Sequence, residues 1–480
     1  HVRGSQRIED AARRHLHIAE GEDTDADRRF TIERVACVGC CSLAPVVQLD
    51  DLTVGHLQTH DVAGAIDRFE AEHKTGGWTD ATADGNGRQA RGEVRISLDS
   101  CCLVGGADAV YRALTDAVAR CVAPVVIRRV GCMGLCRHGP SLQCIEPGGQ
   151  VMTYTGVAVD DVEPIVRRHF DRGGAAWLSR SFTRALDWLV QGRIDEPTEV
   201  RALNHVDPEH QHVDSLQVRI ATEHYGQLDP LDLDGYIERG GFGAWRKIVE
   251  DDDGESVVRW ITASGLRGRG GGGFPTGRKW AMARQQQADR KIVICNGDEG
   301  DPGAFMDRTL MESFPFRVIE GLAIAAHTVG AGEGIFYIRH EYPLALRRIG
   351  RAIELCERAG LIGEGALDGA TSLSLTIREG AGAFVCGEET AMIASIEGHR
   401  GNPTARPPYP VEQGLWGAPT LVNNVETLAN VPWIIRHGPE AFAQYGTDSS
   451  KGAKVFALAG KVRRGGLIEV PMGTTIHEVV

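Results

Sequence analysis

The chain has 480 residues, a formal net charge of −13 and 42% hydrophobic residues, a composition ordinary for a globular protein of roughly two to four domains. The acidic balance argues against general nucleic-acid binding, and no apolar run of about 18 residues occurs, so no membrane span is expected. Twelve cysteines without a secretory signal indicate a reducing compartment, the cytoplasm, where clustered cysteines are more often metal ligands than disulfides.

A sequence repeat occupies the amino-terminal third of the chain. Residues 30–48 recur as residues 125–143. The shared positions are, in the first copy, Ile32, Arg34, Val35, Cys37, Gly39, Cys41, Pro45 and Gln48. Each copy is predicted to form a strand, then a loop with two cysteines four positions apart, then a second strand. The repeat therefore predicts two small α/β modules.

Apolar spacing predicts helices on both sides of each copy. Ile8, Ala11 and Ala12 lie at i, i+3 and i+4 before the first copy, as on the buried face of a helix. Further helices are predicted around residues 110–118, over residues 61–73 and over residues 161–170.

The two cysteines in each loop are candidate iron ligands. A Cys-x3-Cys loop with a glycine inside brings two thiolates to one side of a [2Fe–2S] cluster, and the glycine lets the backbone approach inorganic sulfur. The first copy has the order Cys-x-Gly-x-Cys-x-x-Ala-Pro, which resembles the thioredoxin-like ferredoxin subunit of respiratory complex I. That family holds its cluster with a Cys-x4-Cys and a Cys-x3-Cys pair, so the resemblance implies a [2Fe–2S] cluster in each module. Buried, inert cysteines are the alternative.

The first module departs from this ligand pattern because no cysteine lies between His1 and Arg34. Aligning the glycine turns of the two copies places Cys102 opposite the residue before His1. We therefore expect the sequence to be cut just after a Cys-x4-Cys pair. The ligands left in the first module are Cys37 and Cys41.

The second module departs from the pattern in another way. Ser97 stands where the first cysteine of the Cys-x4-Cys pair is expected, and two cysteines are adjacent near the second position. The predicted ligands are Cys102, Cys132, Cys136 and either Cys101 or a non-cysteine group. Cys40, Cys121 and Cys144 are assigned to packing. Two clusters are expected in the full-length protein, with one or both incomplete in this chain.

Two segments are predicted to be connections between domains. Residues 75–92 are rich in Gly, Asp, Thr and Asn and are predicted to be a linker. Residues 171–240 are predicted to be a connecting region. One helix is predicted inside it, because Phe182, Leu186, Leu189 and Val190 lie at i, i+4, i+7 and i+8.

A glycine-rich stretch carries the most information. Six of the nine residues in 265–273 are glycine, and bare backbone N–H groups let a flat ligand approach. A flexible linker is disfavoured by the Phe, Trp and Lys in and after the run. A P-loop fails because Arg278 stands where Lys is needed. Gly268, Gly270 and Gly273 match Gly-x-Gly-x-x-Gly, but a proline and a glycine follow where a Rossmann helix begins. The run therefore predicts a phosphate-cradling loop of another fold.

Polar motifs follow the glycine-rich stretch in a fixed order. A predicted strand over residues 291–295 delivers Asn296 and Asp298. The later motifs are residues 380–389, residues 397–410 and residues 423–427. The whole array resembles the FMN and NADH site in the flavoprotein subunit of complex I. It also resembles the diaphorase subunits of NAD-linked formate dehydrogenases and hydrogenases. The resemblance implies an FMN- and NADH-binding α/β domain over residues 241–450.

The resemblance also implies the cofactor contacts. Lys279 would face the flavin phosphate, Phe274 and Tyr409 would stack on the dinucleotide, and Glu388 and Glu389 would orient the flavin edge and the NADH ribose. The implied cofactor-binding residues are Gly268, Arg269, Gly270, Phe274, Lys279, Asn296, Asp298, Asp301, Phe384, Gly387, Glu388, Glu389, Arg406, Tyr409, Asn423 and Asn424. Three of them depart from the family: Asp301 replaces a glutamate, Phe384 a tyrosine and Arg406 a lysine.

The predicted fold is α/β throughout. Thioredoxin-like modules are expected over residues 1–74 and 93–170, followed by the flavin domain. Residues 451–480 resemble the start of the family's ubiquitin-like domain. The helical domain that follows in the family carries a Cys-x2-Cys-x2-Cys [4Fe–4S] site, and this sequence has no such motif.

The implied function is that of an NAD-dependent flavin and iron–sulfur oxidoreductase, a diaphorase subunit. Hydride would pass between NAD(H) and FMN by positioning alone, without a protein acid or base, and single electrons through [2Fe–2S] clusters. Two ferredoxin-like modules suggest a formate dehydrogenase or hydrogenase, whose catalytic subunit and possibly another Fe–S subunit would be the partners. A flavin-based electron-bifurcating subunit is the close alternative. A non-catalytic Fe–S scaffold with a vestigial flavin site is the alternative of another class.

Overall fold

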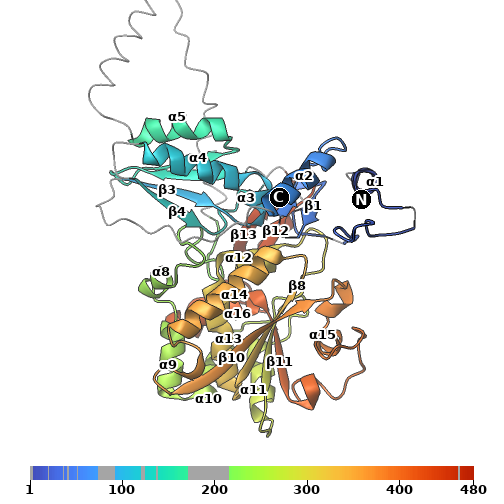
Figure 1. The fold of residues 1–480 in the computed structure, drawn as a ribbon. Coiled ribbons are helices and arrows are strands. Elements are labelled where there is room, and N and C mark those ends of the chain that lie inside the picture. Colours follow the sequence, from blue (N-terminus) through green and yellow to red (C-terminus); the bar gives the residue numbers. More distant parts are fainter. Residues whose placement is uncertain are drawn as a thin grey trace, which may run out of the picture.

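The computed structural model describes residues 4–19, 21–35, 37–40, 43–50, 52–73, 92–120, 125–136, 139–170, 216–462 and 465–479. Two small modules lie beside a larger α/β domain, and the carboxy-terminal hairpin lies between them (Figure 1). The predicted linker over residues 75–92, except residue 92, and the predicted helix around residues 182–190 lie outside the described residues.

The first module consists of two helices and a short hairpin. Its elements are α1 (Ser5–His15), β1 (Val47–Leu49), β2 (Leu52–Val54) and α2 (Val62–His73). Both helices confirm the sequence prediction, and Ile8 of α1 packs on Ile66 of α2 in one apolar cluster. The strand predicted before Cys37 is wrong, because within the described residues 30–35 only Thr31 pairs, in an isolated bridge with Thr24. An apolar pattern forms a strand only where a partner offers a row of hydrogen bonds.

The second module is a four-stranded sheet covered by two helices on one face (Figure 1). Its elements are β3 (Gly92–Ser97), α3 (Ser100–Val104), α4 (Ala107–Ala119), β4 (Val125–Val130), β5 (Ser141–Ile145), β6 (Val151–Thr155) and α5 (Val159–Phe170). The strand order is β4-β3-β5-β6, with β3 and β4 parallel and the other pairs antiparallel. Val94 and Ile96 of β3 pack against Leu114 of α4 and Val162 of α5. The predicted α/β module is therefore confirmed over residues 92–170.

The large domain is built on a five-stranded sheet of order β11-β7-β8-β10-β9. Its strands are β7 (Ile292–Gly297), β8 (Glu333–Arg339), β9 (Gly363–Ala366), β10 (Thr371–Gly380) and β11 (Thr420–Asn424). Its helices are α8 (Leu233–Glu238), α9 (Gly243–Asp251), α10 (Gly254–Ala263), α11 (Thr276–Gln285), α12 (Met306–Ser313), α13 (Pro315–Val329), α14 (Pro343–Arg358), α15 (Glu389–Ile396), α16 (Val425–His437) and α17 (Pro439–Ala443), with short 3₁₀ turns η3 (Phe384–Gly387) and η4 (Leu415–Gly417). The strands other than β9 run parallel.

Both faces of this sheet are buried, as parallel sheets require. Along β7, Val293 and Cys295 belong to the cluster that includes α13 and α16. The alternate residues Ile292 and Ile294 belong to a second cluster with Met392 of α15. This alternation follows from the two-residue period of a strand.

The strand order reverses between β7 and β11. The chain passes from β7 to β8 and β10 on one side, and then returns so that β11 pairs with the other edge of β7. In open α/β sheets, ligands bind outside the carboxyl ends of the strands at such a reversal. The topology alone therefore points to the ends of β7 and β11.

The carboxy-terminal segment forms a hairpin and one helical turn. Its elements are β12 (Ala453–Leu458), β13 (Gly466–Pro471) and α18 (Ile476–Val479). Glu469 of β13 is buried and accepts hydrogen bonds from the backbone of Ala221 and Thr222, which ties the hairpin to the large domain. The predicted α/β fold class is confirmed, while the exact domain limits remain a prediction. Among the described helices, none is long and apolar enough to cross a membrane.

Candidate functional site

Three asparagines mark the carboxyl ends of β7 and β11. Asn424 pairs with Asn296 across the two strands. Asn296 Nδ2 donates to Gly387 O at 2.9 Å, and Trp280 Nε1 donates to Asn423 Oδ1 at 2.8 Å. Asn424 also accepts the Glu426 backbone N–H at the start of α16. These bonds fix the amides at the carboxyl ends of the two strands, where the sequence places cofactor contacts.

The glycine-rich stretch forms a loop that leads into α11 and approaches these strand ends. Gly268 N donates to Phe274 O at 2.9 Å, which closes the loop on itself. A Cβ atom on Gly270 would lie 3.0 Å from Asn424 Cβ, so only glycine lets the loop approach β11 this closely. A Cβ atom on Gly271 or Gly272 would meet no protein atom within 4 Å. The loop therefore presents bare backbone to open space, which fits a flat ligand.

Arg269 does not direct its side chain toward this space. The residue is buried, and its guanidinium donates to the carbonyl oxygens of Arg267, Lys451 and Ala453. Its charge holds the glycine loop to the segment before β12. Only its backbone is left for a cofactor.

Lys279 and Arg406 both form an ion pair with the Glu389 carboxylate. Lys279 Nζ lies 2.7 Å from Glu389 Oε2 and donates to Val422 O at 3.0 Å. Arg406 Nη1 lies 2.8 Å from Glu389 Oε1. The side chains of Lys279 and Glu389 are 21% and 18% exposed, so an anionic ligand can reach the pair from solvent. A phosphate arriving there would find a cation already held in position.

Glu388 caps a helix, a role that its sequence motif did not predict. Its carboxylate accepts the backbone N–H groups of Thr390 and Ala391 and the Thr390 hydroxyl, and so caps α15. A carboxylate at this end is favoured by the helix dipole. Its second oxygen lies 3.7 Å from Arg406.

Asp298 is a buried carboxyl at the end of β7. Its side chain is 4% exposed and lies 3.7 Å from Arg339 Nε, and its Oδ2 atom has no hydrogen-bond partner. Burial raises the pKa of Asp298 to about 7, although the nearby Arg339 cation opposes this shift. An unpartnered buried oxygen costs free energy unless a ligand satisfies it. Asp298 is thus suited to accept a hydroxyl donor from a bound polyol.

Three aromatic residues that are predicted to contact the cofactors have exposed side chains. Phe274, Phe384 and Tyr409 are 44%, 65% and 47% exposed. The guanidinium of Arg278 lies 5.7 Å from the Phe274 ring. Asp301 is also exposed. The exposed rings of Phe274 and Tyr409 leave the predicted stacking on a planar cofactor possible in space, and that role stays a prediction.

The structure brings Asn296, Asn423, Asn424 and the glycine-rich loop together at the carboxyl ends of β7 and β11, and it adds neighbouring residues that sequence reasoning missed. Trp280 holds Asn423, Arg339 flanks Asp298, and Asp307 accepts a hydrogen bond from Asn424 Nδ2 at 2.6 Å. Only burial could have identified them, because each is an ordinary helix or strand residue in the sequence. The donor set of amides, a spare carboxyl and a bare glycine loop fits the ribityl chain and phosphate of FMN.

A second group of candidate residues is the set of buried thiols near the modules. Cys101 is hydrogen-bonded to Cys40 and to Cys136, and Cys136 is hydrogen-bonded to Cys132. Cys102 lies in the apolar core of the second module, where it contacts Ser97 and has Cys132 and Cys101 nearby. Within the described residues, no group of three His, Cys, Asp or Glu side chains could hold a single metal ion.

The other predicted thiols are divided between the two modules. Cys37 is half-buried and accepts the Gly39 backbone N–H at 3.3 Å, whereas Cys41 lies outside the described residues. Cys144 is buried in the second module, and burial raises its pKa to about 12, which suits a packing role. Cys121 lies outside the described residues.

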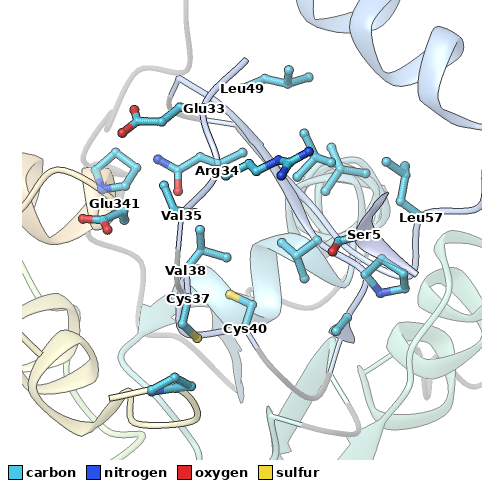
Figure 2. A pocket seen from close by; sticks show the side chains of 18 of the residues that line it. Ser5, Glu33, Arg34, Val35, Cys37, Val38, Cys40, Leu49, Leu57 and Glu341 are labelled. Carbon is cyan, nitrogen blue, oxygen red and sulfur yellow. The ribbon is translucent and has the colours of Figure 1, made fainter. Parts of the chain in front are cut away.

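A hollow of about 1560 Å³ separates the first module from the large domain. Arg34, Val35 and Leu57 line it from the module, and Glu341 lines it from the large domain (Figure 2). Cys37 and Cys40 lie at the same end of the hollow (Figure 2). Asp301, one of the predicted cofactor contacts, also lines this hollow.

Two stretches of the chain match families of known domains. Residues 261–433 match the Nuo51 FMN-binding domain, and residues 1–70 match the thioredoxin-like [2Fe–2S] ferredoxins. The large domain of this chain thus belongs to the Nuo51 FMN-binding family, and its first module to the thioredoxin-like [2Fe–2S] ferredoxins. The resemblance to the complex I flavoprotein subunit and its soluble relatives is confirmed, as are FMN and [2Fe–2S] as the cofactors of these domain families.

Three curated relatives cover about half of this chain. The NADP-reducing hydrogenase subunit HndC of Solidesulfovibrio fructosivorans is 50% identical over 55% of this chain and 54% of its own length. A subunit of the NADH-quinone oxidoreductase of Aquifex aeolicus is 46% identical over 52% of this chain and 58% of its own length. The alpha subunit of the NAD-reducing hydrogenase HoxS of Cupriavidus necator is 44% identical over 47% of this chain and 38% of its own length. The chain therefore spans about half the length of these relatives, or less.

Proposed function

We propose that this chain is the electron-entry subunit of an NADH:acceptor oxidoreductase, a diaphorase. FMN held at the carboxyl ends of β7 and β11 would accept hydride from NADH, and iron–sulfur clusters would carry single electrons away. One observation carries the proposal: Lys279, in the helix that follows the glycine-rich loop, donates to Val422 O of β11 and pairs with Glu389 at the strand reversal.

The protein contributes positioning rather than acid–base chemistry. FMN supplies the exchange between a two-electron hydride and single electrons. Lys279 exchanges Glu389 for the flavin phosphate, and Asp298 accepts a ribityl hydroxyl. Phe274 and Tyr409 hold the nicotinamide and flavin planes together, because hydride transfer needs a near-attack approach.

We propose NAD as the dinucleotide. A carboxylate at Glu389 accepts a hydrogen bond from a ribose 2′-hydroxyl and repels a 2′-phosphate. Arg406 weakens this discrimination because it lies 2.8 Å from the same carboxylate. Two of the three relatives above carry NAD or NADH in their names, and the third carries NADP.

We further propose that the chain works inside a soluble formate dehydrogenase or hydrogenase in the cytoplasm. The relatives above are subunits of hydrogenases or of an NADH-quinone oxidoreductase by name. All described cysteines are free thiols, in keeping with a reducing compartment. The partners would be a catalytic subunit and an Fe–S subunit.

Dye reduction by the full chain tests this proposal. The purified chain is incubated with FMN, separated from free flavin, and mixed with NADH and ferricyanide. The proposal predicts a retained yellow flavin and NADH-dependent dye reduction that is absent before flavin loading. A chain that retains no FMN would support a vestigial flavin site and the non-catalytic scaffold. An FMN-loaded chain that coupled NADH oxidation to two acceptors of different potential would support the bifurcating alternative.

A further inference from the structure

Two buried carboxyl groups share one buried guanidinium beside the candidate flavin site. Asp298 directly follows β7, Arg339 ends the neighbouring strand β8, and Glu341 lies two residues further on. The side chains of Asp298, Arg339 and Glu341 are 4%, 3% and 2% exposed. Buried charges are tolerated only when they are paired and hydrogen-bonded. A single cation therefore has to serve two carboxyl groups here.

Arg339 binds Glu341 more closely than it binds Asp298. Arg339 Nη2 donates to Glu341 Oε1, and Arg339 Nη1 donates to the Glu299 carbonyl oxygen. The Nε atom of Arg339 lies 3.7 Å from Asp298 Oδ1, which is beyond hydrogen-bond distance. Within the described part of the chain, Asp298 Oδ2 has no hydrogen-bond partner. Asp298 is thus the carboxyl that the guanidinium serves less well.

A third carboxyl in this region, that of Glu299, does not depend on the same cation. Its oxygens accept the first backbone N–H groups of α12, those of residues 306–308. The positive end of the helix dipole favours a carboxylate at this position. Among these three carboxyl groups, Asp298 and Glu341 are therefore the two that share the charge of Arg339.

His340 lies between Glu341 and a carboxyl of the first module. Its Nδ1 atom is 3.3 Å from Glu341 Oε2, and its Nε2 atom is 3.8 Å from Glu33 Oε2. Glu341 and Glu33 both line the hollow between the first module and the large domain (Figure 2). The Glu33 side chain is 67% exposed. Glu33 thus offers a comparison carboxyl that touches the same imidazole ring but lies in solvent.

The charged groups that act on Asp298 come from the segment at the end of β8. Burial is the largest cause that raises the pKa of Asp298 to about 7, and the charge of Glu341 raises it further, whereas Arg339 and His340 lower it. From the turn η3, the residue next to Asp298 is Gly387, where an added Cβ atom would lie 4.0 Å from Asp298 Oδ2. A glycine there leaves room for a ligand beside this oxygen.

We propose that Glu341 is a positioning residue for the flavin, because by occupying the Arg339 guanidinium it keeps Asp298 protonated in the flavin-free chain and makes FMN binding release one proton. The inference rests on the proposed function, since it takes FMN as the ligand of Asp298. A ribityl hydroxyl donates most strongly to an ionised carboxyl. The proton of Asp298 therefore passes to solvent as the hydrogen bond to the flavin forms.

Glu341→Gln separates this role from packing. The amide oxygen of glutamine keeps an acceptor for Arg339, while the charge that raises the pKa of Asp298 is removed. Arg339 then acts on Asp298 alone, and an opposite charge at about 4–6 Å lowers the pKa of a carboxyl by about 1–3 units. The substitution should therefore tighten FMN binding below pH 7, whereas a loss of packing would weaken FMN binding at every pH.

The pH dependence of FMN binding by the full chain tests the proposal. The Kd for FMN is measured by fluorescence quenching at about pH 6 and about pH 8, on either side of the ionisation of Asp298. We expect Glu341→Gln to bind FMN about five- to tenfold more tightly than the wild type at the lower pH and equally well at the higher pH. Glu33→Gln is the matched control and should follow the wild type at both.

His340→Asn is the second variant and should act in the opposite direction. The histidine lowers the pKa of Asp298, so its removal should weaken FMN binding at the lower pH. The side chain of His340 is 29% exposed, and this variant keeps the test decisive if Glu341→Gln does not fold. An FMN affinity of His340→Asn that equals the wild-type value at both pH values would then overturn the proposal.

A further measurement needs no flavin. The urea midpoint of the flavin-free chain is followed against pH for wild type, Asp298→Asn, Glu341→Gln and the double variant. The part of the stability that depends on Asp298 should be lost at a pH at least about one unit lower when Glu341 is replaced. Identical FMN and stability profiles for Glu341→Gln and wild type, or an equal change in Glu33→Gln, would overturn the proposal. A shifted stability profile in a chain that retains no FMN would support the link between Glu341 and Asp298 and contradict the proposed function, so the two failures are distinguishable.

Discussion

The candidate flavin site and the thiol junction, where Arg308 of α12 contacts one thiol from each module, are built in opposite ways. The flavin site is assembled at the edge of one sheet, and its charged groups Lys279, Glu389 and Arg406 neutralise one another within reach of solvent. The thiol junction is assembled from three parts of the chain, and its charged group is fully buried. A partly exposed site can exchange its internal ion pairs for a ligand. A buried site must keep its charges compensated in the free and the bound state, so the loss of one charged group should lower the stability of the fold.

The largest difference between the two sites is expected in the free energy of unfolding, when one guanidinium is removed from each. Arg308→Met leaves Glu312 without its cation in a buried position, and breaking a buried pair costs about 3–5 kcal/mol. Arg406→Met breaks a pair whose arginine side chain is 41% exposed, and such pairs contribute about 0–1 kcal/mol. Urea titration of the iron-free, flavin-free chain should therefore show a much lower midpoint for Arg308→Met only. Equal midpoints would mean that the junction tolerates an uncompensated carboxyl.

Removing the Lys279 cation should weaken flavin binding next most strongly. A hydrogen bond to a charged group contributes about 1.5–3 kcal/mol, so Lys279→Ala should raise the Kd for FMN about 10- to 150-fold. The adjacent Arg278→Ala is the control, because Arg278 is an exposed cation beside Phe274. Fluorescence quenching of FMN measures both. An unchanged Kd in Lys279→Ala would mean that Lys279 does not contact the flavin phosphate.

The buried carboxyl of the candidate flavin site should make flavin binding depend on pH. Burial raises the pKa of Asp298 to about 7, so the free protein keeps a proton there below that pH. A ribityl hydroxyl donates to the ionised form, and binding then releases the proton. The FMN affinity should fall by up to about tenfold per pH unit below pH 7, and Asp298→Asn should abolish this dependence. A pH-independent Kd in the wild type would place Asp298 outside the flavin site.

The raised pKa of Asp298 affects the stability of the flavin-free chain in the opposite direction. Low pH weakens FMN binding but stabilises the fold. The unfolded carboxyl ionises near pH 4, whereas the folded one ionises at about 7. The stabilising contribution of protonated Asp298 is therefore full below about pH 4, and it is lost as the pH rises through about 7.

The smallest effect concerns the choice between dinucleotides. Glu389 is partly exposed and compensated by Lys279 and Arg406, so its repulsion of a 2′-phosphate is worth at most about 1 kcal/mol. Glu389→Ala should raise kcat/KM with NADPH relative to NADH by up to about fivefold. Steady-state kinetics with both dinucleotides measure this ratio. A wild type that prefers NADPH would contradict the assignment of Glu389.

The two sites also differ in how much the sequence revealed. The sequence nominated the glycine-rich loop and the strand-end amides because they are contiguous motifs whose glycines and amides have few other uses. It did not predict that Arg269 anchors the loop or that Glu388 caps a helix, since anchoring and capping depend on neighbours that no motif contains. The strand predicted before Cys37 failed for a similar reason, because a strand needs a partner that the pattern does not name.

The junction could not have been predicted from spacing alone. Cys40 and Cys101 meet Arg308 across separations of 268 and 207 residues. The repeat nominated Cys132 and Cys136 as a ligand pair, which stays a prediction, and no local pattern indicated that Cys101 lies beside Cys136. Tertiary packing therefore decides which thiols meet.

Anaerobic addition of NADH to the FMN-loaded full chain tests most directly whether the site at the carboxyl ends of β7 and β11 delivers hydride to a flavin. We expect a stoichiometric amount of NADH to bleach the yellow flavin absorbance and ferricyanide to restore it. FMN that remains bound but stays oxidised with both NADH and NADPH would contradict the proposed function.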